Sequence, residues 1–148
     1  MKILISSDGP HAHYYIRMSW AKVYQAIGHE VAFWHKDQKP AFDAFDEFEP
    51  DLFMGQTYHI NEALIKCIKQ RPHMKVVMRA SDWGDMQKEI NLDKYPILVA
   101  QDEEKRLMEK LKAETGKPDF VHNHYTQNWI DVTHNKWREI GIKPISLI

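Results

Sequence analysis

The sequence is nearly devoid of cysteine, with Cys67 alone among 148 residues. A single cysteine forms neither an internal disulfide nor a cysteine-based zinc cluster, and it fits a reducing compartment. Long apolar runs are missing too. No stretch approaches the roughly 18 consecutive apolar residues of a membrane-spanning helix, and the apolar start at residues 1–5 is too short for the core of a signal peptide. We therefore expect a protein of the cytoplasm without a transmembrane segment.

Neither sign of charge is in excess. Lys and Arg number 20 against 21 for Asp and Glu, which gives a formal net charge of −1. Proteins that bind nucleic acid through its phosphates are usually basic, so we expect no nucleic-acid partner. Hydrophobic residues make up 43% and charged residues 28%, a composition that excludes a disordered chain. A chain of this length predicts one domain, residues 1–148, with a single core.

Short apolar runs alternate with longer amphipathic ones along the whole sequence. This pattern is typical of buried parallel strands joined by crossover helices. We predict strands at residues 3–6, 31–34, 51–55, 75–79, 120–121 and 144–148, and helices at 16–27, 60–68, 102–114 and 129–140. Residues 43–50 form a short helix or a loop, residues 80–94 form a loop, and residues 96–100 form a strand or the start of a buried helix. The fold class is α/β: a Rossmann-like three-layer α/β/α sandwich with a largely parallel sheet.

Polar and aromatic residues follow several of the predicted strands. Ligands of open parallel sheets bind beyond the carboxyl ends of the strands, so these segments predict a cleft at one edge of the sheet. The segments are Ser7 to Tyr14, Gln56 to His59, Ser81 to Gly84 and His122 to Tyr125. Planar polar side chains beside aromatic rings are suited to a sugar, which presents both hydroxyl groups and apolar ring faces.

Alternative chemistry at this cleft has weaker support. The pairs His11/His13 and His122/His124 lack the carboxylate or cysteine that usually completes a metal site, so we predict no metal. A dinucleotide-binding loop needs three glycines at fixed spacing, and the segment after the first strand supplies only Gly9.

Four segments together resemble the N-terminal half of a GT-B glycosyltransferase of the family 4 type, in the spore-maturation-protein-like group. They are the first strand with its Asp8-Gly9 loop, Gly-His-Glu-Val at 28–31, Pro-Asp-Leu-Phe at 50–53 and Val-Val-Met-Arg-Ala-Ser-Asp at 76–82. The resemblance covers essentially the whole chain but only half of such an enzyme. Ser81 stands where many relatives carry the histidine of a His-Asp pair.

The resemblance implies an acceptor-binding domain of an enzyme that transfers a sugar from a nucleotide-diphosphate sugar. Its partners would be a small-molecule or glycan acceptor and a missing C-terminal domain that holds the donor. The chain also stops inside an apolar run, which suggests a fragment of a longer protein. No other cofactor is implied, and the fragment alone would be inactive. With right-handed crossovers we expect the first four strands in the order three-two-one-four.

The residues of the predicted cleft then take roles by their chemistry. Asp82 and His11 are the candidate catalytic residues, as a general base or as hydrogen-bond partners of the reacting hydroxyl. Asp82 could equally cap the segment that follows it. The predicted substrate-binding residues are Asp8, Gly9, His13, Gln56, Tyr58, Ser81, Trp83, Asn123, His124 and Tyr125. Tyr58, Trp83 and Tyr125 would supply stacking faces.

A second hypothesis is a stand-alone flavodoxin-like or receiver-like binding module without transferase activity. A receiver needs an acidic pair after its first strand and a lysine after a late strand. The first loop carries Asp8 alone, which disfavours the receiver version of this hypothesis.

Overall fold

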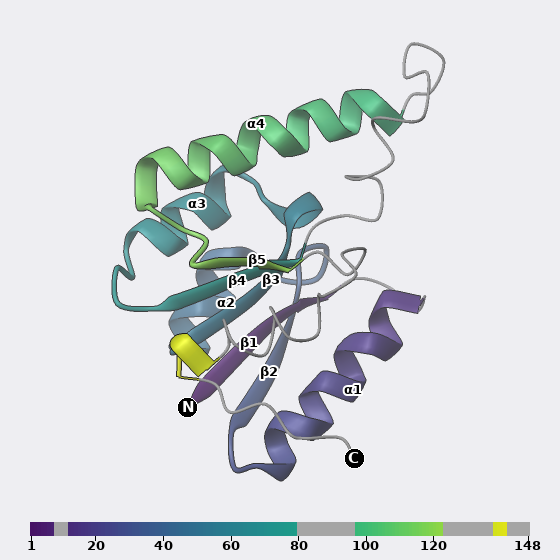
Figure 1. The fold of residues 1–148 in the computed structure, drawn as a ribbon, viewed down its shortest axis with the longest axis vertical. Helices are drawn as coiled ribbons and strands as arrows, with labels where there is room; N and C mark the ends of the chain where they lie inside the picture. Colours follow the sequence, from purple (N-terminus) through teal and green to yellow (C-terminus); the bar gives the residue numbers. More distant parts are fainter. Residues whose placement is uncertain (8–11, 80–96, 123–137, 142–148) are drawn as a thin grey trace.

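The computed structural model describes residues 1–7, 12–79, 97–122 and 138–141 of the chain (Figure 1). Within these residues lies a five-stranded sheet in which every neighbouring pair of strands is parallel, in the order β2-β1-β3-β4-β5. The strands are β1 (Lys2–Ser7), β2 (Glu30–His35), β3 (Leu52–Gln56), β4 (Lys75–Arg79) and β5 (Phe120–His122). The predicted α/β class with a parallel sheet is confirmed.

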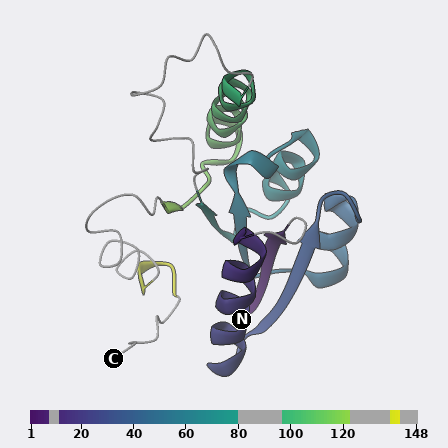
Figure 2. The same ribbon diagram turned by 90° about the vertical axis from the view of Figure 1, so that its right-hand side faces the viewer.

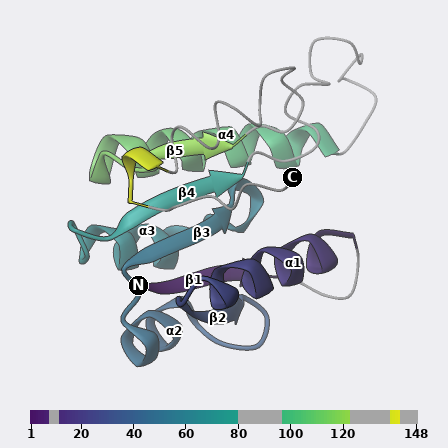
Figure 3. The same cartoon turned by 60° about the horizontal axis from the view of Figure 1, so that its bottom comes forward.

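Helices cover both faces of this sheet. They are α1 (Ala12–Ala26), α2 (Ala41–Phe48), α3 (Glu62–Lys69) and α4 (Ile97–Thr115), with a short 3-10 helix, η1 (Thr57–His59), directly after β3. Figures 2 and 3 show α1 on one face and α2, α3 and α4 on the other. Two buried clusters correspond to these faces. One contains Leu4, Phe53 and Val76 under α2–α4, and the other contains Ile3 and Ile5 under α1.

The predicted strand order of three-two-one-four is wrong, because β3 lies beside β1 and not beside β2. A right-handed crossover from β2 to β3 carries the chain back past β1 when the connecting helix, α2, packs on the sheet face opposite α1. Aromatic packing holds α2 on that face. The ring of Phe45 lies 5.1 Å from that of Phe53 and 6.4 Å from that of Trp34, centroid to centroid. The direction of winding therefore reverses between β1 and β3.

The spacing of Ile16, Trp20, Val23 and Ile27 predicts the apolar face of the helix expected at 16–27, and the face that is buried lies one position further along. The buried residues of α1 are instead Arg17, Ala21 and Tyr24, while Ile27 lies beyond the helix and is exposed. Gly28 ends this region in a left-handed conformation, with φ of +94°. The displacement turns a charged side chain, Arg17, toward the sheet.

The remaining predicted elements have mixed outcomes. The strand at 75–79 is confirmed, residues 43–50 belong mostly to helix α2, and residues from 97 onward begin helix α4 and not a strand. The predicted loop at 80–94, most of the helix at 129–140 and the strand at 144–148 lie outside the described residues.

Candidate functional site

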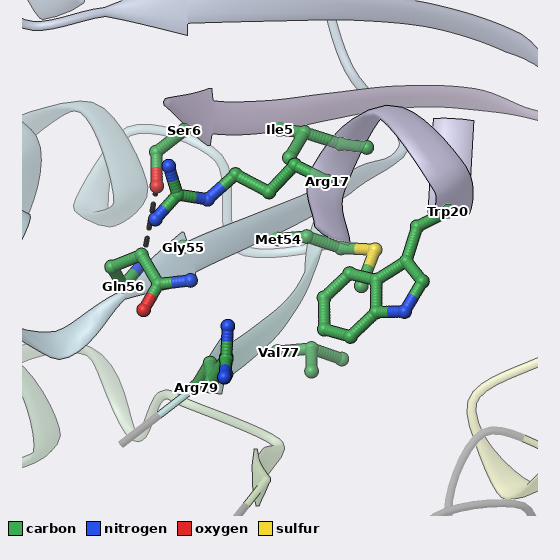
Figure 4. Close-up of a pocket in the computed structure, with 9 residues that line it drawn as sticks. All are labelled: Ile5, Ser6, Arg17, Trp20, Met54, Gly55, Gln56, Val77 and Arg79. Carbon is green, nitrogen blue, oxygen red and sulfur yellow. Dashed lines mark hydrogen bonds between the residues drawn. The ribbon is translucent and has the colours of Figure 1, made fainter. Parts of the chain in front are cut away.

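A small cavity lies where the winding of the sheet reverses, at the carboxyl ends of β1 and β3. Open parallel sheets bind ligands at this kind of switch point. The cavity has a volume of about 10 Å³, room for about one water molecule. It is lined by Ile5, Ser6, Arg17, Trp20, Met54, Gly55, Gln56, Val77 and Arg79 (Figure 4).

Buried polar groups join β1 to the segment after β3. The hydroxyl oxygen of Ser6 accepts a hydrogen bond from the backbone N–H of Gln56 at 3.1 Å, and it lies 3.1 Å from Nδ1 of His59. The Ser6 hydroxyl can donate to Nδ1 of His59 or accept a second hydrogen bond from it, depending on the tautomer of the imidazole. Ser6, Gln56 and His59 are all at most 2% exposed.

Arg17 reaches this cluster from helix α1. Its Nη2 donates a hydrogen bond to the hydroxyl of Tyr58 at 3.0 Å, and the Tyr58 ring meets the His59 ring edge-on at 4.3 Å between centroids. Thr57, the first residue of η1, donates a hydrogen bond to the carboxylate of Glu104 on α4. The three residues of η1 therefore connect both helical layers to the edge of the sheet.

Gly55 and Arg79 complete the cavity from β3 and β4. Arg79 ends β4 directly beside Gln56 in the sheet register and is 5% exposed. A Cβ atom on Gly55 would lie 2.6 Å from Sδ of Met78 and 2.7 Å from Cε1 of Phe53, so these side chains would have to shift to admit any other residue here.

Two of the predicted site residues, Gln56 and Tyr58, belong to this arrangement. His13 lies in the first turn of α1. The other predicted residues lie outside the described part of the chain, namely Asp8, Gly9, His11, Ser81, Asp82, Trp83, Asn123, His124 and Tyr125. Their roles stay predictions.

Sequence reasoning missed Arg17, Arg79 and Ser6, whereas His59 lies in a segment predicted to line the cleft. Arg79 and Ser6 fall at the ends of predicted apolar strands, and Arg17 falls within a predicted helix without an assigned role. One signal was present. At helical spacing, Arg17 lies on the same face of α1 as Ala21 and Tyr24. The small and aromatic side chains on that face indicate that it is the buried one.

No group of three or more His, Cys, Asp or Glu side chains that could hold a metal ion occurs among the residues whose side chains are described. In the same part of the chain, no helix combines the length and the apolar character needed to cross a membrane.

No protein-family model matches the sequence, and no curated protein matches it. Solved structures do match. The RcsB response regulator of Salmonella typhimurium is 14% identical with a TM-score of 0.52, and the match covers 98% of this chain and 62% of RcsB. The isolated REC domain of RcsB from Salmonella enterica serovar Typhimurium, solved with the phosphomimetic BeF3−, is 14% identical with a TM-score of 0.50, covering 97% of this chain and 91% of that domain. At an identity this low, the structural similarity establishes the fold alone, and that fold is flavodoxin-like. The chain spans less than two thirds of RcsB.

These comparisons overturn the resemblance to a GT-B glycosyltransferase. The two matches described above are the RcsB response regulator and its isolated REC domain, and the order of β1, β2 and β3 is the flavodoxin-like one. Two of the short motifs that suggested a transferase, at 28–31 and 50–53, lie at the starts of β2 and β3, a position that other Rossmann-like sheets share. The resemblance was also the support for three predicted partners, which are therefore no longer supported: the sugar acceptor, the nucleotide-sugar donor and the missing donor domain.

The expected absence of a nucleic-acid partner is also unsupported. RcsB of the same fold has been solved bound to a promoter and to two parallel DNAs. A near-zero net charge alone does not exclude such a partner.

Proposed function

We propose that this chain is a receiver-like binding module that acts by reversible binding at the carboxyl ends of β1, β3 and β4, and not by accepting a phosphoryl group. The observation that carries the proposal is the convergence of Ser6, Gln56 and Arg79 from three strands, with Arg17 from α1, on one cavity. Buried polar groups of this kind, gathered at a switch point, are typical of a binding site.

The residues at the strand ends argue against phosphoryl transfer to a carboxylate. The described strands end in Ser7, His35, Gln56, Arg79 and His122, none of which is acidic. An acyl phosphate forms on Asp or Glu, and Gln56, which ends β3 between β1 and β4, carries an amide instead. Asp8 is the single acidic residue in the loop that follows β1.

Treatment with acetyl phosphate and Mg²⁺, followed by intact-mass measurement, tests the absence of phosphoryl transfer. The REC domain of RcsB, treated in parallel, is the reference. We expect no added phosphoryl group on this chain. A stoichiometric mass increase would contradict the proposal.

A nuclear magnetic resonance screen of small molecules tests the binding site. Ligands should shift the backbone amide signals of Ser6, Gln56 and Arg79 while leaving those of α3 unchanged. A screen whose ligands all shift signals away from the carboxyl edge of the sheet would contradict the proposed site.

The cytoplasm is the location that we propose for this module. Cys67 is the one cysteine of the chain and is buried, and a chain that builds no internal disulfide suits a reducing compartment.

A further inference from the structure

Two arginines from different elements line the cavity at the switch point. Arg17 of α1 is 1% exposed and Arg79 of β4 is 5% exposed. Figure 4 shows their guanidinium groups on either side of the Gln56 side chain. Burial of two like charges close together is costly unless negative charge or strong acceptors offset it. None of the nine lining residues is acidic.

Both guanidinium groups also make other interactions, such as the hydrogen bond from Arg17 to Tyr58. A guanidinium carries five N–H donors in a fixed planar arrangement. Each arginine can therefore keep its present partner and still donate to a ligand in the cavity.

The polar side of the cavity contains an acceptor as well as donors. Oε1 of Gln56 is buried and accepts no hydrogen bond within the described part of the chain. A ligand suited to this site has several acceptor oxygens for the arginines and one O–H group for Gln56. Phosphate in its monohydrogen form has both, whereas sulfate has no proton to donate at neutral pH.

We propose that this cavity is a binding site for a phosphate-type oxyanion, held between Arg17 and Arg79 with Gln56 as the acceptor of its O–H group. The assignment rests on the proposed function and names the class of ligand that the module recognises. Arginine is well suited to this class, because its planar donors match two phosphate oxygens at once.

The size of the cavity adds a condition. A volume of about 10 Å³ admits a water molecule but not a phosphate ion, so side chains must move when the ligand enters. Trp20 is the one partly exposed residue among the nine that line the cavity, while the others are buried. Ligand entry should therefore displace Trp20 and change its fluorescence.

Titration with inorganic phosphate, followed by calorimetry and by tryptophan fluorescence, tests the site. For an ion of five heavy atoms we expect a dissociation constant between about 10 μM and 1 mM. Arg17→Lys and Arg79→Lys keep the charge but lose the paired donors, so each should weaken binding about 10- to 100-fold. Arg106→Met is the control for net charge, because Arg106 is exposed on α4 and pairs with Glu103. It should bind phosphate as the parent protein does.

Gln56→Glu separates loss of the site from loss of the fold. The new carboxylate has nearly the same shape and places a negative charge beside both arginines. It should abolish phosphate binding and raise the melting temperature. The proposal is overturned if Gln56→Glu lowers the melting temperature and leaves the phosphate affinity unchanged, or if the parent protein shows no saturable binding at 10 mM phosphate, an excess of about tenfold over the weakest expected dissociation constant.

Related anions identify the ligand more closely. Sulfate should bind more weakly than phosphate, and equal binding of the two would contradict the role of Gln56. Phenyl phosphate tests the form of the ligand when it is compared with inorganic phosphate at about pH 5, where the ester also keeps one O–H group for Gln56. Tighter binding than inorganic phosphate assigns a phosphate ester whose apolar body lies against Trp20, and equal binding assigns the free ion. If phosphate fails to bind while the nuclear magnetic resonance screen finds another ligand at the same residues, the ligand class is wrong and the proposed function stands.

Discussion

Replacement of Arg71 by alanine should destabilise the protein far more than replacement of its ion-pair partner Asp46. Arg71 follows α3 and holds it against α2. One nitrogen, Nη1, donates to the carbonyl oxygen of Cys67 at 3.2 Å, and the other, Nη2, donates to Oδ1 of Asp46 at 2.7 Å. The guanidinium carbon also lies 5.3 Å above the centre of the Phe45 ring.

Exposure decides how these contacts contribute. The Arg71 side chain is 13% exposed and that of Asp46 is 66% exposed, so solvent screens the ion pair, which is worth about 0.5 kcal/mol. The hydrogen bond to the Cys67 carbonyl adds about 1 kcal/mol. The contact with Phe45, together with burial of the aliphatic part of Arg71, adds about 1 kcal/mol more. We therefore expect Arg71→Ala to cost about 2–3 kcal/mol and Asp46→Ala about 0.5 kcal/mol.

Urea unfolding of the two single variants and the double variant measures these free energies. The double variant should be at most about 0.3 kcal/mol less stable than Arg71→Ala, because Asp46 has already lost its main partner in that variant. Glu49, whose Oε1 lies 3.7 Å from Arg71, provides a matched exposed control in Glu49→Ala, with an expected cost near zero. The reasoning is refuted if Asp46→Ala costs as much as Arg71→Ala, since the ion pair would then be the main contribution.

Three further predictions concern other parts of the fold. Gly55→Ala should lower the free energy of unfolding by about 1–3 kcal/mol, because its Cβ would overlap Met78 and Phe53, and a thermal melt unchanged from the parent would be inconsistent with that packing. Burial raises the pKa of the Cys67 thiol to about 11, so a thiol reagent at pH 8 should label it only as fast as the protein opens, and labelling at the rate of a free peptide would contradict its burial. Burial and the N-terminal ammonium group hold the pKa of His29 below its usual 6.5. The contribution of His29 to stability is therefore complete above pH 6.5 and is lost as the pH falls through the lowered pKa. A titration by nuclear magnetic resonance that gives a pKa of 6.5 or more would contradict this.

The sequence predicted the individual elements better than their arrangement. β4 was recognisable as a run of apolar residues ended by Arg79, and the end of α1 was marked by Gly28. The order of the strands was not recognisable, because it depends on which face α2 covers. That choice is made by contacts of Phe45 with Trp34 and Phe53, which depend on packing in three dimensions and not on any spacing visible along the chain.

The candidate site was predicted only in part for a related reason. Polar residues directly after a strand are visible in the sequence, and Gln56 and Tyr58 were found in this way. Arg17 comes from the middle of a helix and meets the sheet edge only because α1 turns that face inward. Ser6 looked like the end of an apolar strand until η1 brought His59 within 3.1 Å of its hydroxyl.

A crystal structure of the protein soaked with arsenate, an anomalously scattering analogue of phosphate that keeps one O–H group at neutral pH, tests the central claim most directly. An arsenic peak is expected at the carboxyl ends of β1 and β3, between the guanidinium groups of Arg17 and Arg79, with Trp20 displaced. A structure in which the anion binds elsewhere, or in which this site stays empty at a saturating concentration, would contradict it.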